Sequence, residues 1–274
     1  MPTSFNRSPV TPTPPKPPMD FFDCNITIGR RATRNVGSVY TVSDIASTLD
    51  HYGIKRALVS HAMCEDSGPL PGNEILLSEI KGHDRFAPCW VLLPDHTGEV
   101  DDPESLVTRM AENGVKATKI YPIKHYFSLS EWCTGKILSK LAQHEVPLLI
   151  DFNIVHYSDA AQNIHWDSIN EICRNYEDLP VILLRLGGNV NRNLFPLLGK
   201  FENLHIDISY YSVNDGIEMV CEKFGADHLI FGTGLSTFSP EAPISMLIYS
   251  DIPMRDKRAI AYGNLDELLK SALT

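Results

Sequence analysis

The chain has 274 residues, of which 43% are hydrophobic and 21% charged, a composition typical of a soluble globular protein with one large domain. Its formal net charge of −10 argues against a nucleic-acid or anionic-membrane partner. No apolar run approaches the ~20 residues that span a bilayer, and no secretory h-region opens the chain. The six scattered cysteines indicate reduced thiols, so we expect a cytoplasmic protein.

The first 19 residues form a proline-rich arm in this interpretation. Residues 1–18 include seven prolines, which prevent a helix and favour an irregular or polyproline conformation. The arm is either a disordered tail or a strap that lies on the body or on a partner subunit. We expect residues 20–274 to form one domain.

Beyond residue 20, short apolar runs alternate with amphipathic segments. The runs predict eight strands, at 21–28, 56–61, 86–93, 117–122, 147–152, 180–186, 204–210 and 228–233. Several of them are continuously apolar, as in strands that are covered on both faces. The segments between and after them predict helices at 41–54, 102–114, 129–145, 166–177, 215–226, 239–252 and 255–274, the first with Ser43 as N-cap and Gly53 at its end.

Eight strands that alternate with helices, at about 30 residues per unit, predict an α/β fold of the (β/α)8 barrel type. The alternative is a doubly wound open sheet. It lacks support because no glycine-rich phosphate loop follows the first strand.

Charged side chains stand where three of the predicted strands leave the barrel. Lys119, Asp151 and Arg185 each end an apolar run, and a buried charge is unfavourable unless it is paired. In a barrel the carboxyl ends of the strands meet at one mouth. The three charges therefore predict either a buried ion-pair cluster or a ligand site, and the sequence leaves both open.

Several segments, taken in order, resemble the amidohydrolase-related family of metal-dependent barrel hydrolases and decarboxylases. They are FFDCNITIG, YGIKRALVSH, GNEILLSEIKGHDRFAPCWVLLP, GVKATKIYP, EVPLLIDF, PVILLRLGG, NLHIDISY, FGADHLIFGTGLS and GNLDELL. The resemblance covers the chain from about residue 20 to its end. It implies the barrel fold and a hydrolase or lyase activity.

The positions that hold the family's metal carry other residues here. The HxH of the first strand falls on Asn25 and Thr27, the histidines of strands five and six fall near Asp151 and on Arg185, and the aspartate of strand eight falls on Gly234. Arginine cannot ligate a cation and glycine has no side chain. We therefore expect no metal cofactor, although a metal held by His61, Asp151 and His156 stays an alternative.

A small anionic compound, a carboxylate or phosphate, is the ligand that this pattern favours. The guanidinium of Arg185 suits such groups, with Asn25, Thr233 and His125 as further binding residues. Asp151, Lys119 and His61 are the candidate catalytic residues, with Asp151 either orienting Arg185 or acting as a base.

Two classes of function remain open. The first is a divergent hydrolase or lyase that acts without a metal, and the second is a non-catalytic binding or scaffold protein that keeps the barrel. We also expect a homo-oligomer, as is common in the family that the chain resembles.

Overall fold

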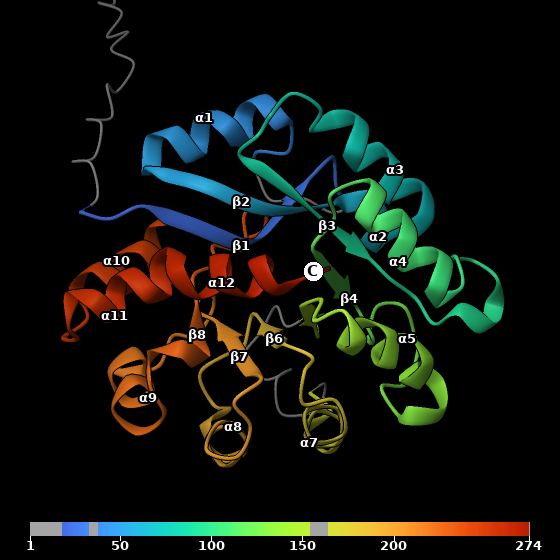
Figure 1. The fold of residues 1–274 in the computed structure, drawn as a ribbon. Coiled ribbons are helices and arrows are strands. Elements are labelled where there is room, and N and C mark those ends of the chain that lie inside the picture. Colours follow the sequence, from blue (N-terminus) through green and yellow to red (C-terminus); the bar gives the residue numbers. More distant parts are fainter. Residues whose placement is uncertain (1–17, 33–37, 154–163, 274) are drawn as a thin grey trace, which may run out of the picture.

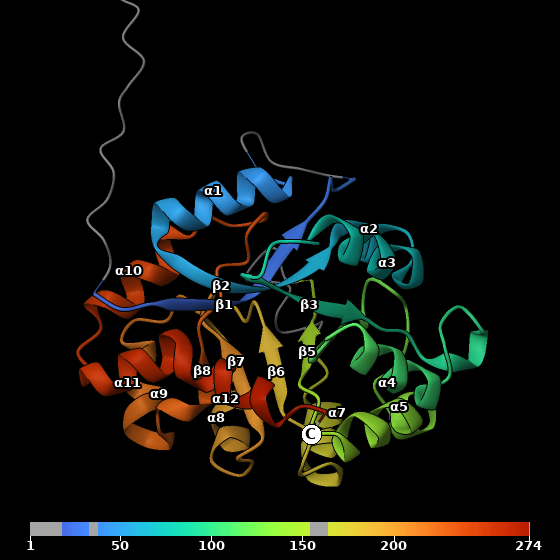
Figure 2. The same cartoon turned by 45° about the horizontal axis from the view of Figure 1, so that its top comes forward.

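The computed structural model describes residues 18–32, 38–153 and 164–273. Most of the predicted proline-rich arm and His156 lie outside these residues. Within them the fold is an eight-stranded parallel sheet with the strands in the order β1 to β8 (Figures 1 and 2). The predicted (β/α)8 barrel is confirmed, and the open-sheet alternative is excluded by this order.

The strands are short and almost entirely buried. They are β1 (Phe21–Ile28), β2 (Ile54–His61), β3 (Phe86–Val91), β4 (Ala117–Ile120), β5 (Leu148–Asp151), β6 (Val181–Leu184), β7 (Leu204–Asp207) and β8 (Leu229–Ile230). Several end earlier than the apolar runs predict, because the run continues past the last ladder hydrogen bond into the loop above.

The helices surround the sheet in Figures 1 and 2. They are α1 (Val42–Tyr52), α2 (Ala62–Asp66), α3 (Pro69–Glu79), α4 (Pro103–Glu112), α5 (Glu131–Gln143), α7 (Trp166–Asn175), α8 (Asn191–Leu198), α9 (Gly216–Phe224), α10 (Glu241–Tyr249), α11 (Met254–Arg258) and α12 (Asn264–Ser271). Short 3-10 turns lie at Asp95–Thr97 and Ala226–His228, and a π-turn at Ala259–Gly263 joins α11 to α12.

The predicted boundaries of the first helix are nearly right, but its N-cap is wrong. Thr41 caps α1, because its side chain accepts a hydrogen bond from the Asp44 N–H at 3.1 Å, whereas Ser43 lies inside the helix. Gly53 ends the helix as predicted, with a φ of 73° that glycine adopts without steric strain.

The sequence pattern did not predict the helices after β2 and β6. The segment that forms α3 begins Pro-Leu-Pro-Gly, which reads as a turn, and α8 contains Pro196 in its interior. Both form because their apolar side chains are buried against the sheet. Leu76 of α3 and Leu194 of α8 are fully buried.

The interior of the barrel is apolar toward the amino ends of the strands and polar toward their carboxyl ends. Phe22, Leu58, Leu149 and Ile182 pack inside it with other small and aliphatic residues, and Leu265 of α12 joins this cluster. Figure 1 shows α12 crossing in front of the strands. The opposite end of the barrel, where the strands finish, has buried polar side chains such as Lys119, Asp151 and Asp207.

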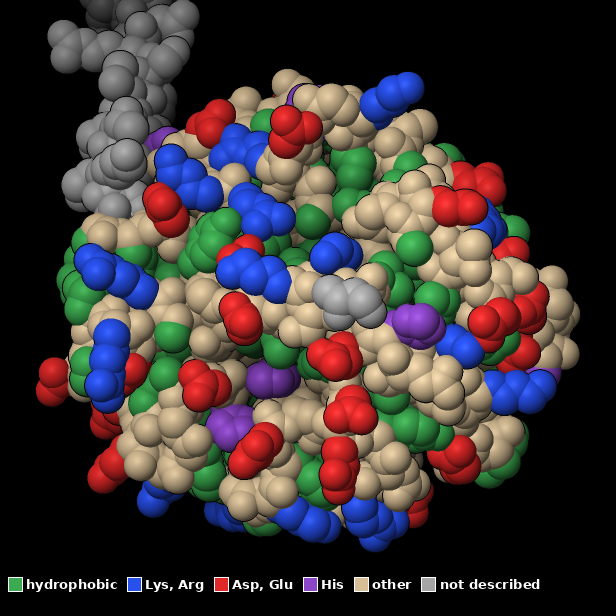
Figure 3. Space-filling view, in the orientation of Figure 1, with side chains coloured by type: hydrophobic (Ala, Val, Ile, Leu, Met, Phe, Trp, Pro, Cys, Tyr) green, Lys and Arg blue, Asp and Glu red, His purple; other side chains and the backbone are tan. Residues whose placement is uncertain are grey.

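Three further properties of the described residues concern the cysteines, the surface charge and the helix lengths. All six cysteines lie in the described residues as free thiols. Acidic and basic side chains are interspersed over the face in Figure 3. None of the described helices has the length and apolarity that crossing a bilayer would require.

Candidate functional site

Lys119, Asp151 and Arg185 meet at the carboxyl ends of three adjacent strands, and at most 4% of any of them is exposed. The Nε and Nη2 groups of Arg185 donate to Asp151 Oδ1 at 3.1 and 2.5 Å. Lys119 Nζ lies 3.5 Å from Asp151 Oδ2. One carboxylate thus faces two cations, which leaves one positive charge in this trio.

Asn25 links the trio to a second carboxyl group deeper in the barrel. Its Oδ1 accepts a hydrogen bond from Lys119 Nζ at 2.9 Å, and its Nδ2 donates to Asp207 Oδ2 at 3.3 Å. Asp207 also accepts from the Arg185 N–H at 2.7 Å and the Ser209 hydroxyl at 2.6 Å. The side chain of Asn25 is therefore fixed between an anion and a cation.

Mutual pairing keeps the side chains of Asp151 and Lys119 ionised. Burial alone would raise the pKa of Asp151, but Arg185 and Lys119 hold it below its usual value. Burial alone would lower the pKa of Lys119, but Tyr121 and Asp151 raise it. Asp207 differs, because burial raises its pKa to about 6 despite its hydrogen bonds.

Glu65 of α2 and residues from three loops cover this cluster, and the sequence pattern did not predict them as site residues. Arg31, in the loop after β1, donates from Nη2 to both carboxylate oxygens of Glu65 at 2.7 Å and from Nη1 to Thr237 Oγ1 at 2.6 Å. Asn153 Nδ2 also donates to Glu65 Oε1, at 3.0 Å. Glu65 is only 4% exposed, so these loops form a polar roof over the charged trio.

A cavity of about 10 Å³ remains under this roof. That volume suits about one water molecule. Its lining unites predicted and missed residues: Asn25, Thr27, Arg31, Glu65, Lys119, Tyr121, Asp151, Arg185, Gly234 and Thr237. We call this set the barrel mouth.

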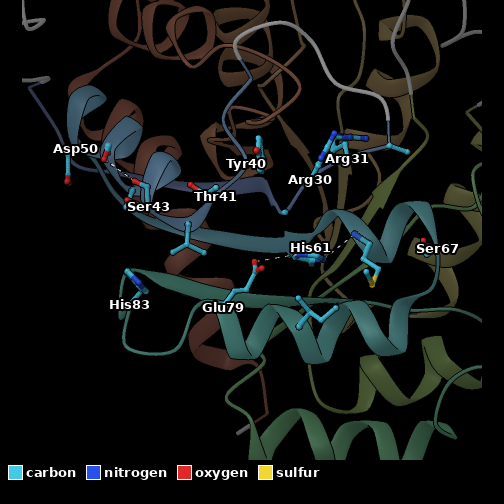
Figure 4. A pocket seen from close by; sticks show the side chains of 17 residues that line it. Arg30, Arg31, Tyr40, Thr41, Ser43, Asp50, His61, Ser67, Glu79 and His83 are labelled. Atoms are coloured by element: carbon cyan, nitrogen blue, oxygen red, sulfur yellow. Dashed lines mark hydrogen bonds and ion pairs between the residues drawn. The ribbon is translucent and has the colours of Figure 1, made fainter.

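Three of the predicted site residues lie outside the mouth lining. Thr233 is fully buried, and its hydroxyl donates to Asp23 Oδ2. His125 lies at the roof, with Nε2 3.2 Å from the Glu65 carbonyl oxygen. His61 lines a separate groove, where its Nδ1 accepts from the Met63 N–H and its Nε2 lies 3.6 Å from Glu79 (Figure 4).

Backbone conformation is unusual at one residue of the mouth and at one residue of its roof. Asn153 and Arg185 both have a φ of 54°, in the left-handed region. Such residues persist only where their surroundings hold them, and they concentrate at functional sites.

The sequence contains no comparable signal for Glu65 and Arg31. Both lie in connections between strands, and the sequence pattern does not predict the path of these connections.

No three His, Cys, Asp or Glu side chains among the described residues gather as a metal site requires.

Several solved structures share the fold. One is a 2,6-dihydroxybenzoate decarboxylase from Rhizobium, with 14% identity, a TM-score of 0.72, and coverage of 92% of this chain and 99% of that one. Another is a dihydroxybenzoic acid decarboxylase from Polaromonas sp. JS666, with bound manganese and the inhibitor 2-nitroresorcinol. Its identity is 13%, its TM-score 0.73, and the coverage 92% and 97%.

A 5-carboxyvanillate decarboxylase from Novosphingobium aromaticivorans, complexed with manganese and a nitrobenzoic acid, matches at 13% identity with a TM-score of 0.71. The match covers 92% of this chain and 96% of that one. A search among curated protein sequences finds no match. The amidohydrolase family model matches residues 37–269. With that match across most of the barrel, the chain belongs to the amidohydrolase family.

Proposed function

We propose that this protein is a hydrolase or lyase of the amidohydrolase family that holds a small monoanionic substrate through Arg185 and Lys119. The observation that carries the proposal is the trio of Lys119, Asp151 and Arg185, in which one carboxylate faces two cations. With Arg31 and Glu65 included, three cations and two carboxylates line the cavity, so the lining itself carries one positive charge, and the carboxyl group of Asp207 lies behind Asn25 outside this lining. A carboxylate or a singly charged phosphate ester would neutralise it.

The donors of the mouth suit an oxyanion. Arg185 donates to Asp151 from Nε and Nη2. Its side chain also lines the cavity, and the guanidinium has further N–H groups that can donate. Fixed cations in a site that excludes water stabilise negative charge that develops on a substrate during reaction. In this proposal Asp151 orients Arg185, since both of its oxygens face cations and its pKa is lowered.

Two buried acceptors beside Glu65, outside the mouth lining, require a hydrogen-bond donor, which water or a ligand hydroxyl group supplies and a carboxylate does not. His125 Nδ1 and Asn153 Oδ1 have no hydrogen-bond partner among the described residues. Nε2 of His125 faces a carbonyl oxygen and burial lowers the pKa of the ring, so Nδ1 is the bare acceptor of a neutral imidazole. Buried acceptors of this kind are usually satisfied by water or a ligand.

The donor set does not suit the divalent metal that the family fold implies. The amide oxygen of Asn25 accepts from Lys119, and both oxygens of Asp151 face cations. A divalent ion would have to displace the ammonium and the guanidinium from these oxygens against their repulsion. The proposed anion site therefore uses protein cations in place of a metal. Elemental analysis after incubation with manganese and zinc checks this, and a stoichiometric metal would contradict it.

Anion titration of the purified protein tests the binding role. We expect acetate and inorganic phosphate to bind the wild-type protein, and Arg185→Met to weaken both by tenfold or more. Arg56→Met is the matched control, because Arg56 lies at the other end of the barrel, 4.4 Å over the Phe22 ring. A folded Arg185→Met variant that binds both anions as tightly as the Arg56→Met variant would overturn the proposal.

The pairing of Asp151 favours a second candidate, a non-catalytic binding protein, because both of its oxygens face cations and its pKa is lowered. The cavity of about 10 Å³ admits neither a substrate nor acetate unless the roof opens, so both candidates require that opening. Screening of carboxylic esters, lactones and aromatic carboxylates for turnover separates the two. Turnover that Lys119→Met abolishes supports the enzyme, whereas anion binding without turnover of any of these compounds supports the binding protein.

A further inference from the structure

A cavity much larger than the mouth is a groove beside it. The groove has a volume of about 1160 Å³ and lies between α1 and α3, over the outer side of β2 (Figure 4). In the close-up, Thr41, Ser43 and Asp50 lie on its α1 side, and Glu79 and His83 lie on the opposite side. A volume of this size accommodates a whole small molecule.

The part of the groove that α1 lines is mostly uncharged. Val42 and Ala46 supply apolar surface, Ser43 and Ser47 supply hydroxyl groups, and Ile75 faces them from α3. The lining has as many basic as acidic side chains, Arg30 and Arg31 against Asp50 and Glu79. Glu79 lies 3.6 Å from His61, and Asp50 accepts at 2.6 Å from Nη1 of Arg85, which lies outside the lining. This lining suits an uncharged chain that has both apolar and hydrogen-bonding groups.

Arg31 is the wall that the groove and the mouth share. It lines both cavities, and it is 17% exposed whereas its partner Glu65 is 4% exposed. An anion that enters from the groove would meet the guanidinium of Arg31 before it meets Arg185. Such an anion can replace Glu65 on Arg31, because both offer two oxygens to the same planar donors.

We propose that the groove binds the uncharged tail of the monoanionic ligand, while its charged head passes Arg31 and enters the mouth. This inference rests on the proposed anion site and adds the class of ligand: an elongated monoanion with an amphipathic, uncharged tail. It accounts for a mouth that has charge complementary to an anion but almost no room, next to a groove that has room but little net charge.

Two probes separate the head from the tail. Acetate carries the head alone, and N-hexanoylglycine carries a carboxylate, an amide and an apolar chain. We expect N-hexanoylglycine to bind the wild-type protein at least tenfold more tightly than acetate. Ser47→Phe should remove that gain and leave acetate affinity within twofold, because the phenyl group obstructs the part of the groove that α1 lines and Ser47 does not line the mouth.

Ser78→Phe is the matched control for this variant. Ser47 and Ser78 are both exposed, and each hydroxyl bonds a carbonyl of its own helix, but Ser78 does not line the groove. Ser78→Phe should change neither affinity. Ala46→Phe is a second obstruction from the same face of α1, and it should act as Ser47→Phe does.

The outcomes distinguish the two proposals. The groove inference is wrong, and the anion site stands, if acetate binding depends on Arg185 but N-hexanoylglycine binds no more tightly than acetate. The same conclusion follows if Ser47→Phe and Ala46→Phe still bind N-hexanoylglycine more tightly than acetate by the wild-type factor. If the wild-type protein binds neither probe, or Arg185→Met binds both undiminished, the anion site itself is wrong.

Discussion

The side chain and the backbone of Arg185 are both held by carboxylates. A non-glycine residue with a φ of 54° is less stable than in the usual regions by about 1–2 kcal/mol. Its N–H donates to Asp207 Oδ1 at 2.7 Å, and its guanidinium bonds Asp151. Two buried anions thus fix the direction in which this cation points, which is what a preformed anion site requires.

A double-mutant cycle measures the pairing of Arg185 with Asp151. Removal of one partner leaves a buried charge with less compensation, so Arg185→Met and Asp151→Asn should each lower the free energy of unfolding by about 3–5 kcal/mol. Since each single change already removes the pair, the double variant should lose clearly less than the sum. Urea unfolding at pH 7 provides the four stabilities.

The control cycle uses an exposed ion pair of similar length. Lys140 Nζ lies 2.5 Å from Glu104 Oε2, and Glu104 is 78% exposed. Lys140→Met and Glu104→Gln should couple by less than about 1 kcal/mol. A coupling at the buried pair no larger than this would show that Arg185 and Asp151 do not stabilise each other.

At the residue scale, the sequence predicted the trio but not its roof. Lys119, Asp151 and Arg185 stand out because each is a single charge at the end of an apolar run. Arg31 and Glu65 have no such pattern, since they lie outside the strands. Their closeness depends on how two connections fold over the mouth, which local periodicity does not encode.

Among the elements, α3 is hydrogen-bonded to the sheet through the side chain of Asn73. Asn73 Nδ2 donates to the Val91 carbonyl oxygen, and its Oδ1 accepts from the Val91 N–H, both at 2.9 Å. Val91 is the last residue of β3, where the strand ladder ends. The amide side chain thus supplies the partners that a neighbouring strand would otherwise provide.

Asn73→Ala should therefore destabilise the protein by about 3 kcal/mol, because it leaves two buried backbone groups unpaired. Hydrogen exchange at the Val91 amide should become faster, and urea unfolding gives the stability. Asn193→Ala on α8 is the control, an exposed asparagine whose loss should change stability by about 0.5 kcal/mol or less. Equal stabilities of the two variants would contradict the role of Asn73.

This contact explains why the sequence predicted the strands of this region better than its helices. Apolar runs such as that of β3 are visible without knowledge of their partners. The start of α3 has turn-forming residues, and the helix is positioned by Asn73 and Leu76 through contacts that exist only in the folded barrel.

For the whole molecule, closure of the barrel depends on the seam between the first and last strands. The Cys24 N–H donates to the Phe231 carbonyl oxygen at 3.0 Å. The Thr233 N–H donates to Asp23 Oδ1 at 3.1 Å, and the Thr233 hydroxyl donates to Asp23 Oδ2 at 2.5 Å. Eight repeating units predict that a seam exists, but the aspartate–threonine pair that forms it has no signature in the sequence.

Burial raises the pKa of Asp23 to about 6, although the Thr233 hydroxyl lowers it. The pKa of Asp23 in the folded state lies above the usual value of 3.8, so the folded state binds this proton more tightly than the unfolded state. The stabilising contribution of Asp23 is therefore complete below pH 3.8 and is lost as the pH rises through about 6. The Thr233 hydroxyl limits this loss, because it donates to the ionised carboxylate.

Thr233→Val should accordingly lower stability more at pH 8 than at pH 5, by about 1 kcal/mol, since a hydrogen bond to a charged group is the stronger one. Urea unfolding at the two pH values measures the difference. Thr134→Val is the control, because the buried Thr134 hydroxyl donates to the neutral Leu129 carbonyl oxygen at 3.1 Å, and its loss should not depend on pH. If Thr233→Val loses the same at both pH values, or more at pH 5, Asp23 does not close the barrel as a titrating carboxyl.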